Sequence, residues 1–321
     1  MTGVLRIGSR GSKLAMVQSE WVRDRLLELN PGLEIEIEVI QTKGDKLLDA
    51  PLSKIGDKGL FTKELETAML EGRTDLSVHS AKDMPTELPD GLGLVAFTRR
   101  EDVRDTFVAG NGARPASIAE VAEGAVIGTS SLRRRSQLLA LRPDLELVDI
   151  RGNVQTRLRK LDEHCMAGTV LAAAGLARLG RSDLVAFAFG FDEMLPAVGQ
   201  GSLAIEARLG DERVAALVAP LIDEASSLAL RAERALMRTL QGGCQVPIAA
   251  LAELTGADEP GPAGREALRL RAFVGSLDGR RSVRGELEGA LGAPEALGEA
   301  LAERLLADGA DVILAEVRGE S

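Results

Sequence analysis

The chain has 321 residues, of which 45% are hydrophobic, and this is enough for two or three domains with buried cores. A net charge of -10 and an aromatic content of 2%, without any tyrosine, disfavour nucleic acid and anionic membranes as partners. No apolar run reaches the length of a membrane span, the N-terminus lacks the pattern of a secretory signal, and two cysteines with two histidines leave a four-ligand zinc site without any spare ligand. We therefore expect a cytoplasmic protein without a metal.

The first hundred residues predict alternating strands and helices. Residues 4–8 predict a buried strand, and a turn then leads into a helix that ends near residue 30. Residues 33–41 alternate between apolar and polar types, which indicates a second strand. Residues 61–71 predict a helix, and residues 76–79 predict a short strand. This order is typical of an α/β domain.

A similar pattern returns later in the chain. Residues 126–131 repeat the strand, glycine, hydroxyl and helix start of residues 6–12, and residues 170–174 predict another buried strand running into a loop. Two similar α/β domains with a cleft between them are the simplest architecture. The final part predicts a smaller α+β domain, in which a helix leads to Cys244 and is followed by two strands, then a terminal helix and strand; its elements are expected at residues 228–240, 267–274, 282–287 and 294–316.

The two strand-turn-helix segments are candidate anion sites. The unpaired N–H groups at a helix N-terminus attract negative charge, and Ser12 and Ser131 could cap the helices or donate to an oxyanion. Arg133, Arg134 and Arg135 fall in a first helical turn, where the helix dipole disfavours cations, so we expect a ligand anion to compensate them. A solvated basic face is an equal alternative for this run alone. The second basic segment, at residues 151–157, favours the ligand.

Four other features carry chemistry or leave alternatives open. Asp83 lies at a strand end, where α/β folds bind ligands, but the pattern alone favours a surface ion pair with Lys82. We interpret His79 as a structural histidine. Cys244 follows two glycines on a loop and could reach a ligand, although a buried small hydrophobe is the commonest fate of a free cysteine. The polar stretch at residues 43–59 is either a lid or a disordered loop.

Seven segments, in order along nearly the whole chain, resemble the porphobilinogen deaminase (hydroxymethylbilane synthase) family: residues 5–10, 59–66, 78–85, 127–134, 151–158, 195–201 and 242–244. The resemblance implies a transferase that joins four porphobilinogen molecules head to tail through a cationic azafulvenium species. Ammonia is lost, and the linear tetrapyrrole is used in haem and chlorophyll biosynthesis. The resemblance also implies a dipyrromethane cofactor attached through a thioether to Cys244, and it implies a monomer.

The resemblance further implies two periplasmic-binding-protein-like α/β domains, residues 1–99 with 201–219 and residues 100–200, and an α+β cofactor-attachment domain at residues 220–321. Asp83 is implied as the catalytic carboxylate. The other implied site residues fall into three groups, which are Ser80, Lys82, Asp83, Thr129, Ser131, Arg133, Arg134 and Arg157 for the cofactor, Arg10, Ser12, Arg151, Arg178 and Gln200 for the substrate, and Lys54, Lys58 and Phe61 for the lid.

Two functions of other classes compete with this interpretation. A carboxylate-binding module would also use two lobes and an arginine-lined cleft, but it has no need for Cys244 or a third domain. A nucleic-acid binder would use the arginine run, which the net charge and the missing aromatics oppose. No role is assigned to Arg135, Arg159, Cys165 or residues 255–264.

Overall fold

The computed structural model describes residues 4–46, 59, 61–110, 112–243, 246–256 and 266–320. The chain forms two compact units, Met1–Glu101 with Gly201–Ser227 and Asp102–Gln200 with Leu228–Ser321. The predicted division into three domains, with an additional boundary near residue 220, stays a prediction. None of the described helices is long and apolar enough to cross a lipid bilayer.

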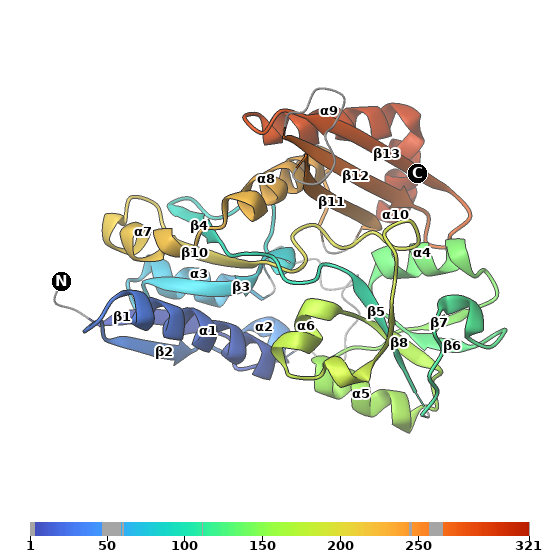
Figure 1. The fold of residues 1–321 in the computed structure, drawn as a ribbon, viewed down its shortest axis with the longest axis horizontal. Coiled ribbons are helices and arrows are strands. Elements are labelled where there is room, and N and C mark those ends of the chain that lie inside the picture. The colour runs from blue at the N-terminus through green and yellow to red at the C-terminus, as the bar shows by residue number, and fades with distance from the viewer. Residues whose placement is uncertain are drawn as a thin grey trace. The chain divides into compact units, whose positions relative to one another are not determined.

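The first unit contains a five-stranded mixed sheet. Its central strand pairs in parallel on one side and antiparallel with a strand from the returning chain on the other. Helices α1 and α7 bury apolar side chains against one face of this sheet (Figure 1). In sheet order the strands are β2 (Ile35–Val39), β1 (Leu5–Ser9), β3 (Leu76–Ser80), β10 (Leu203–Arg208) and β4 (Leu92–Phe97), and the helices are α1 (Lys13–Leu29), α2 (Lys43–Lys46), α3 (Lys63–Leu70) and α7 (Glu212–Val218).

The second unit contains a sheet of the same design. Two pairs are parallel, and the fourth strand in the order runs antiparallel to both of its neighbours. The expected loop after the strand near residue 170 is wrong, because the strand ends at Ala172 and a short helix follows directly. In sheet order the strands are β7 (Glu146–Val148), β6 (Val126–Gly128), β8 (Gly168–Ala172), β5 (Asp105–Ala109) and β9 (Val185–Ala188), and the helices are α4 (Leu132–Leu141), α5 (Val154–Glu163) and α6 (Ala173–Arg178).

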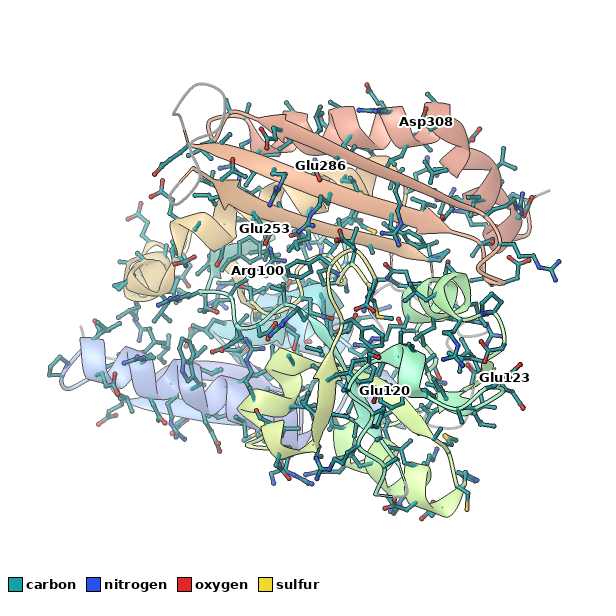
Figure 2. All side chains as sticks on the ribbon, turned by 45° about the vertical axis from the view of Figure 1, so that its right-hand side comes forward. Arg100, Glu120, Glu123, Glu253, Glu286 and Asp308 are labelled. Carbon is teal, nitrogen blue, oxygen red and sulfur yellow. The ribbon has the colours of Figure 1, made fainter. Side chains whose placement is uncertain are left out.

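A three-stranded antiparallel sheet completes the second unit. One face packs against apolar side chains of three helices, and α9 lies over it in Figure 1. The other face carries opposite charges on neighbouring strands, and Figure 2 labels Glu253 and Glu286 there. Arg271, which is Glu286's cross-strand partner, also pairs with Glu253 at 2.6 Å. The elements are β11 (Ile248–Thr255), β12 (Ala267–Gly275), β13 (Ser282–Gly289), α8 (Glu224–Thr239), α9 (Pro294–Leu305) and α10 (Asp311–Arg318).

The expected terminal strand within residues 294–316 is wrong. Two helices, α9 and α10, stand in its place and are joined across a kink at Leu306–Ala310, where Gly309 has a non-helical φ of 101°. The apolar spacing there serves helix packing, since Leu301, Leu305 and Ile313 all join one core. Short 3-10 helices complete the structure at Ala81–Asp83, Ile118–Glu120, Ser182–Leu184 and Ala219–Leu221.

The matching strand orders confirm the predicted pair of similar α/β folds, and the three-stranded sheet with its helices confirms the smaller α+β region. In each mixed sheet the first three strands of the order are parallel to one another. The fourth strand runs antiparallel to both of its neighbours, and the fifth forms the other edge. In each sheet the antiparallel strand is the one that follows a crossing of the chain between the two units: β5 begins at Asp105 and β10 at Leu203.

A buried carboxylate holds helix α4 to strand β5. The Asp105 oxygens lie 2.6 Å from Arg133 Nη1 and 2.7 Å from Arg134 Nη2. Asp105 is fully buried and each arginine is only 5% exposed. Burial alone would raise the pKa of Asp105, but the charges and hydrogen bonds of the two guanidinium groups outweigh it and hold that pKa well below its usual range. A protein carboxylate thus supplies part of the negative charge expected beside these cations, and the expected ligand anion stays a prediction.

We expect Asp105→Asn to lower the free energy of unfolding by about 3–5 kcal/mol, because two buried guanidinium groups would lose their anion. Urea denaturation measures this. Asp102→Asn is the matched control, since Asp102 pairs with Arg104 at 2.7 Å on the exposed surface and such pairs contribute about 1 kcal/mol or less. Equal losses in the two variants would contradict the role assigned to Asp105.

The same ion pairs predict a pH dependence. The pKa of Asp105 is lower in the folded protein than in the unfolded chain, where an aspartate titrates near about pH 3.9. The pairs therefore stabilise the fold above that pH, and this stability is lost as the pH falls toward the folded pKa. The gap in urea midpoint between wild type and Asp105→Asn should accordingly be widest near neutrality and shrink below about pH 4.

Candidate functional site

A pocket in the first unit gathers residues from the ends of two parallel strands. Arg10 and Ser12 follow β1, and Asp83 follows β3, so both loops lie at the same edge of the sheet. The pocket is lined by Arg10, Ser12, Leu14, Ala15, Gln18, Phe61, Thr62, Val78, His79, Ser80 and Asp83. The structure thus brings together five of the residues predicted from the sequence for the site.

Hydroxyl groups in this pocket are held by neighbouring hydrogen bonds. The prediction that Ser12 caps a helix is confirmed, because its Oγ accepts the Ala15 N–H at 3.3 Å at the start of α1. Ser80 Oγ accepts a bond of 2.9 Å from the buried Gln18 side chain of the same helix. An accepting hydroxyl keeps its own proton, so both serines remain able to donate to an anion.

Arg10 and Phe61 contact each other. The Arg10 guanidinium carbon lies 4.3 Å from the centre of the Phe61 ring, within the range of a cation–π interaction. A residue predicted to bind substrate therefore touches one predicted to belong to the lid. The other predicted lid residues, Lys54 and Lys58, lie outside the described residues.

Asp83 supplies a carboxylate to this pocket. It ends the short 3-10 helix that follows β3, and its side chain is exposed while the neighbouring Lys82 is half-buried. Of the pocket-lining residues that the structure describes, Asp83 is the only acid. A carboxylate beside a guanidinium and hydroxyl groups is suited to orient, stabilise or deprotonate a cation.

The prediction of a structural role for His79 is confirmed. Its Nε2 lies 3.0 Å from a carboxylate oxygen of Glu206, and both side chains are buried. His79 also lines the pocket that contains Asp83.

In the second unit, the predicted cofactor residues surround the start of α4. The predicted cap is confirmed, as Ser131 Oγ accepts the Arg134 N–H at 3.5 Å. Thr129 Oγ1 in turn accepts the Ser131 N–H at 3.3 Å. Arg133 and Arg134 extend from the same turn toward Asp105, and they share its single negative charge. Among the described residues, the two cations and one carboxylate of this ion-pair group leave one excess positive charge in the group.

A second group of predicted arginines lies around α5. Arg157 Nε donates to the Gly152 carbonyl at 2.9 Å, and Gly152 has a φ of 117°, a conformation that favours glycine. Arg151 Nη1 is buried and has no hydrogen-bond partner in the described parts of the chain. Arg178 ends α6 and is half-buried.

The structure gives Gln200 contacts that the sequence did not predict. Its side chain is 1% exposed and donates to the Val103 carbonyl at 2.7 Å and to Asp105 at 3.1 Å. It therefore supports the buried carboxylate, and its predicted contact with substrate stays a prediction.

Cys244 lies outside the described residues, but the chain leading to it is constrained. Gly242 packs so closely on Met237 and Ile248 that a side chain there would overlap them. Gln241 has a φ of 51°, which is rare for a residue other than glycine. The loop thus takes a tight path immediately after α8.

Two buried acids that support these segments were missed. Asp105 lies 28 residues before Arg133, so their pairing leaves no local signal. Glu233 on α8 is fully buried and accepts the N–H groups of Gly199 at 2.7 Å and Ala252 at 2.8 Å. Its place on the apolar side of an amphipathic helix is the one signal that could have indicated it.

Comparison with solved structures finds distant likenesses. A methionine-binding protein covers 68% of this chain and 88% of its own, with 14% identity and a TM-score of 0.43. The periplasmic aliphatic sulphonate binding protein of Escherichia coli covers 75% and 71%, with 14% identity and a TM-score of 0.40.

Comparison with protein families and curated proteins finds much stronger likenesses. The model of the porphobilinogen deaminase dipyrromethane cofactor binding domain matches residues 5–216, and that of the porphobilinogen deaminase C-terminal domain matches residues 227–307. The porphobilinogen deaminase of Geobacter sulfurreducens is 51% identical over 313 residues, covering 98% of this chain and 94% of that protein. That of Carboxydothermus hydrogenoformans is 46% identical over 315 residues, covering 98% and 97%. The chain therefore belongs to the porphobilinogen deaminase family, and it is an enzyme of the transferase class with a dipyrromethane cofactor.

Proposed function

We propose that this enzyme joins four porphobilinogen molecules head to tail, releases ammonia at each addition, and yields linear hydroxymethylbilane for tetrapyrrole biosynthesis. The observation that carries the proposal is the pocket in which Asp83 is the one acid beside Arg10 and several hydroxyl groups. Porphobilinogen bears an acetate and a propionate, which suit guanidinium and hydroxyl donors. The cation formed when ammonia leaves suits a carboxylate.

The residues of the second unit fit a dipyrromethane group. Such a group carries several carboxylates, and when bound it supplies the pyrrole carbon from which the chain is extended. Arg133 and Arg134 share one protein carboxylate, and Arg151 has a buried, unpartnered nitrogen among the described residues. Buried positive charge without a counter-charge is costly, so an anionic ligand would stabilise this region. We assign the cofactor to Ser80, Lys82, Asp83, Thr129, Ser131, Arg133, Arg134 and Arg157, with attachment at Cys244.

Substrate and growing chain are assigned to a second set of donors. Guanidinium groups can bind carboxylates through two parallel hydrogen bonds, which fixes orientation as well as charge. The contact between Arg10 and Phe61 supports a link between the substrate site and the proposed lid. The set consists of Arg10, Ser12, Arg151, Arg178 and Gln200, with Lys54, Lys58 and Phe61 as lid residues.

Asp83 is the proposed catalytic residue. Each addition needs a proton on the departing amine and removes a proton from a pyrrole carbon, so one carboxylate can pass the proton between them. The same carboxylate stabilises the intervening cation. At about 4 Å in an effective dielectric of about 20, this attraction is worth roughly 4 kcal/mol, or about a thousandfold in rate.

The enzyme is further proposed to act as a cytoplasmic monomer. Attachment of the cofactor needs a free thiol, and cytoplasmic conditions keep cysteines reduced. Cys165 is an exposed free cysteine, which such conditions tolerate.

We expect Cys244→Ser to lack the cofactor. Intact-protein mass spectrometry of the wild type after incubation with porphobilinogen should show an adduct of two linked pyrroles, and peptide mapping should place it on Cys244. The matched control is Cys165→Ser, which removes the other thiol and should keep the adduct. An adduct on Cys244→Ser would contradict the assigned attachment.

We expect Asp83→Asn to lower kcat about a thousandfold with little change in KM, because the amide cannot stabilise the cation or carry the proton. Ammonia release measures both constants, and intact mass should first show that the variant carries its cofactor. Asp90→Asn, which makes the same change at an exposed carboxylate of the following loop, is the control and should match the wild type. Wild-type turnover by Asp83→Asn would rule out this role.

We expect Arg151→Gln to raise KM about 10–100-fold, since a hydrogen bond to a charged group contributes about 1.5–3 kcal/mol. Steady-state kinetics with porphobilinogen measures the change. Arg159→Gln is the control, because Arg159 is exposed and pairs with Glu163 at 3.3 Å within α5. Should both variants behave alike, Arg151 has no special part in binding carboxylates.

A further inference from the structure

A group of polar side chains lies on the face of the first unit's sheet opposite the α1 and α7 core. Ser77 and Glu206 are direct partners on β3 and β10, and His79 follows two residues after Ser77. Side chains two residues apart on a strand, and direct cross-strand partners, share one face of a sheet. Leu76, Val78 and Ile205 take the opposite face and belong to the apolar core.

Helix α3 adds a second acid to this buried group. Ser77 and Glu206 are fully buried, His79 is 6% exposed, and Glu66 on α3 is also 6% exposed. Glu66 and Glu206 are close enough for the charge of one to influence the other. Acidic side chains are almost never buried to this extent without a partner.

The hydrogen bonds of the group are incomplete. His79 Nε2 lies 3.0 Å from one Glu206 oxygen. The other oxygen of Glu206, Oε1 of Glu66 and the hydroxyls of Ser77 and Thr74 are buried without partners in the described parts of the chain. A buried oxygen left unpaired costs about 1–3 kcal/mol, and a proton on one carboxyl group turns an acceptor into a donor.

The balance of charges also indicates that one of the two acids carries a proton. Glu206 and Glu66 would together place two negative charges beside one imidazole in a dry region. The other charged groups that face this region are Glu64 from α3, Arg208, which is two residues after Glu206 on β10 and pairs with Asp75 and Asp211, and, across the pocket, Arg10 and Asp83. Strand β1 presents Gly8, which brings no charge. Burial raises the pKa of Glu66 above its usual value, the charge of Glu206 raises it further, and Thr62 and His79 offset only part of this.

We propose that Glu66, Glu206 and His79 are positioning residues for the reaction, in which Glu66 is a neutral acid and Glu206 is the single carboxylate that orients the His79 ring in the wall of the Asp83 pocket. The proposal rests on the function proposed above. A neutral Glu66 keeps a second negative charge out of a pocket that must accept substrate carboxylates and an ionised Asp83. Glu206 fixes which ring nitrogen of His79 carries a proton, as carboxylate partners of histidine commonly do.

Infrared spectroscopy of the cofactor-loaded enzyme at neutral pH tests the state of Glu66 without turnover. The expected spectrum contains a carboxylic acid band that disappears in Glu66→Gln. Glu71→Gln is the control, because Glu71 is an exposed acid at the end of the same helix and should leave the band in place. No acid band in the wild type, or a band that survives in Glu66→Gln, would overturn the proposal even if the enzyme proves to be a porphobilinogen deaminase.

The pH profile of kcat/KM tests the positioning role. In the wild type, ionisation of Glu66 at high pH should add a basic limb that falls about tenfold per pH unit. This limb should be absent in Glu66→Gln, because an amide does not ionise, and Glu206→Gln should raise KM as His79 loses its orientation. Profiles of unchanged shape in both variants, with the acid band assigned to Glu66, would mean that the cluster only supports the fold.

If Glu206→Gln folds poorly, the pH dependence of the stability of Glu66→Gln tests the proposal instead. A group whose folded pKa is raised stabilises the protein below its unfolded pKa, and this contribution is lost as the pH rises through the folded pKa. The urea midpoint of the wild type should therefore fall relative to that of Glu66→Gln as the pH increases. A constant difference across the pH range would contradict a buried neutral Glu66.

Discussion

The ion pairs of Asp105 with Arg133 and Arg134 are the interaction on which the second unit depends. The helix dipole and burial both oppose two guanidinium groups in the first turn of α4, and a buried carboxylate on β5 offsets both costs. The compensation is incomplete, because one negative charge faces two positive ones. A site built in this way is already folded and oriented, yet it retains a positive charge that a carboxylate-bearing ligand can neutralise. The same arrangement therefore links the stability of the unit to its affinity for anions.

Glu233 performs a related task for the chain that leads to Cys244. One carboxylate oxygen accepts the N–H of Gly199 and the other accepts that of Ala252, so α8, the segment before Gln200 and strand β11 are held by a single buried side chain. Gln200 then reaches Asp105. Through these contacts the two buried acids belong to one continuous network inside the second unit. Rigid support of this kind is what a covalently attached group needs if it is to be presented in one orientation.

Much of the fold could be predicted from the sequence, because its evidence was local. The strict alternation before residue 40 and the strand-glycine-hydroxyl pattern at β1 and β6 predicted both sheets, and Ser12 and Ser131 cap helices as their position before the helix suggested. The errors occurred where tertiary packing decides. An apolar run at the C-terminus fits a strand as well as a helix until its core partners are known. Long-range partners such as Asp105 leave no pattern near the arginines that they neutralise, so the sequence indicated only a ligand anion or a solvated basic face for this run.

The two units differ in the buried charge that lies near the proposed carboxylate-binding residues. In the second unit, positive groups are buried and only partly neutralised, which favours anions. In the first, Asp83 is exposed in its pocket, the Glu206 carboxylate behind it is paired with His79, and burial raises the pKa of Glu66. An additional negative charge there would repel the carboxylates of substrate and compete with Asp83 for any cation. On the proposed mechanism, a neutral Glu66 would leave Asp83 as the acid that acts in this pocket, and the selectivity of the site for one reacting carboxylate would depend on residues that no substrate touches.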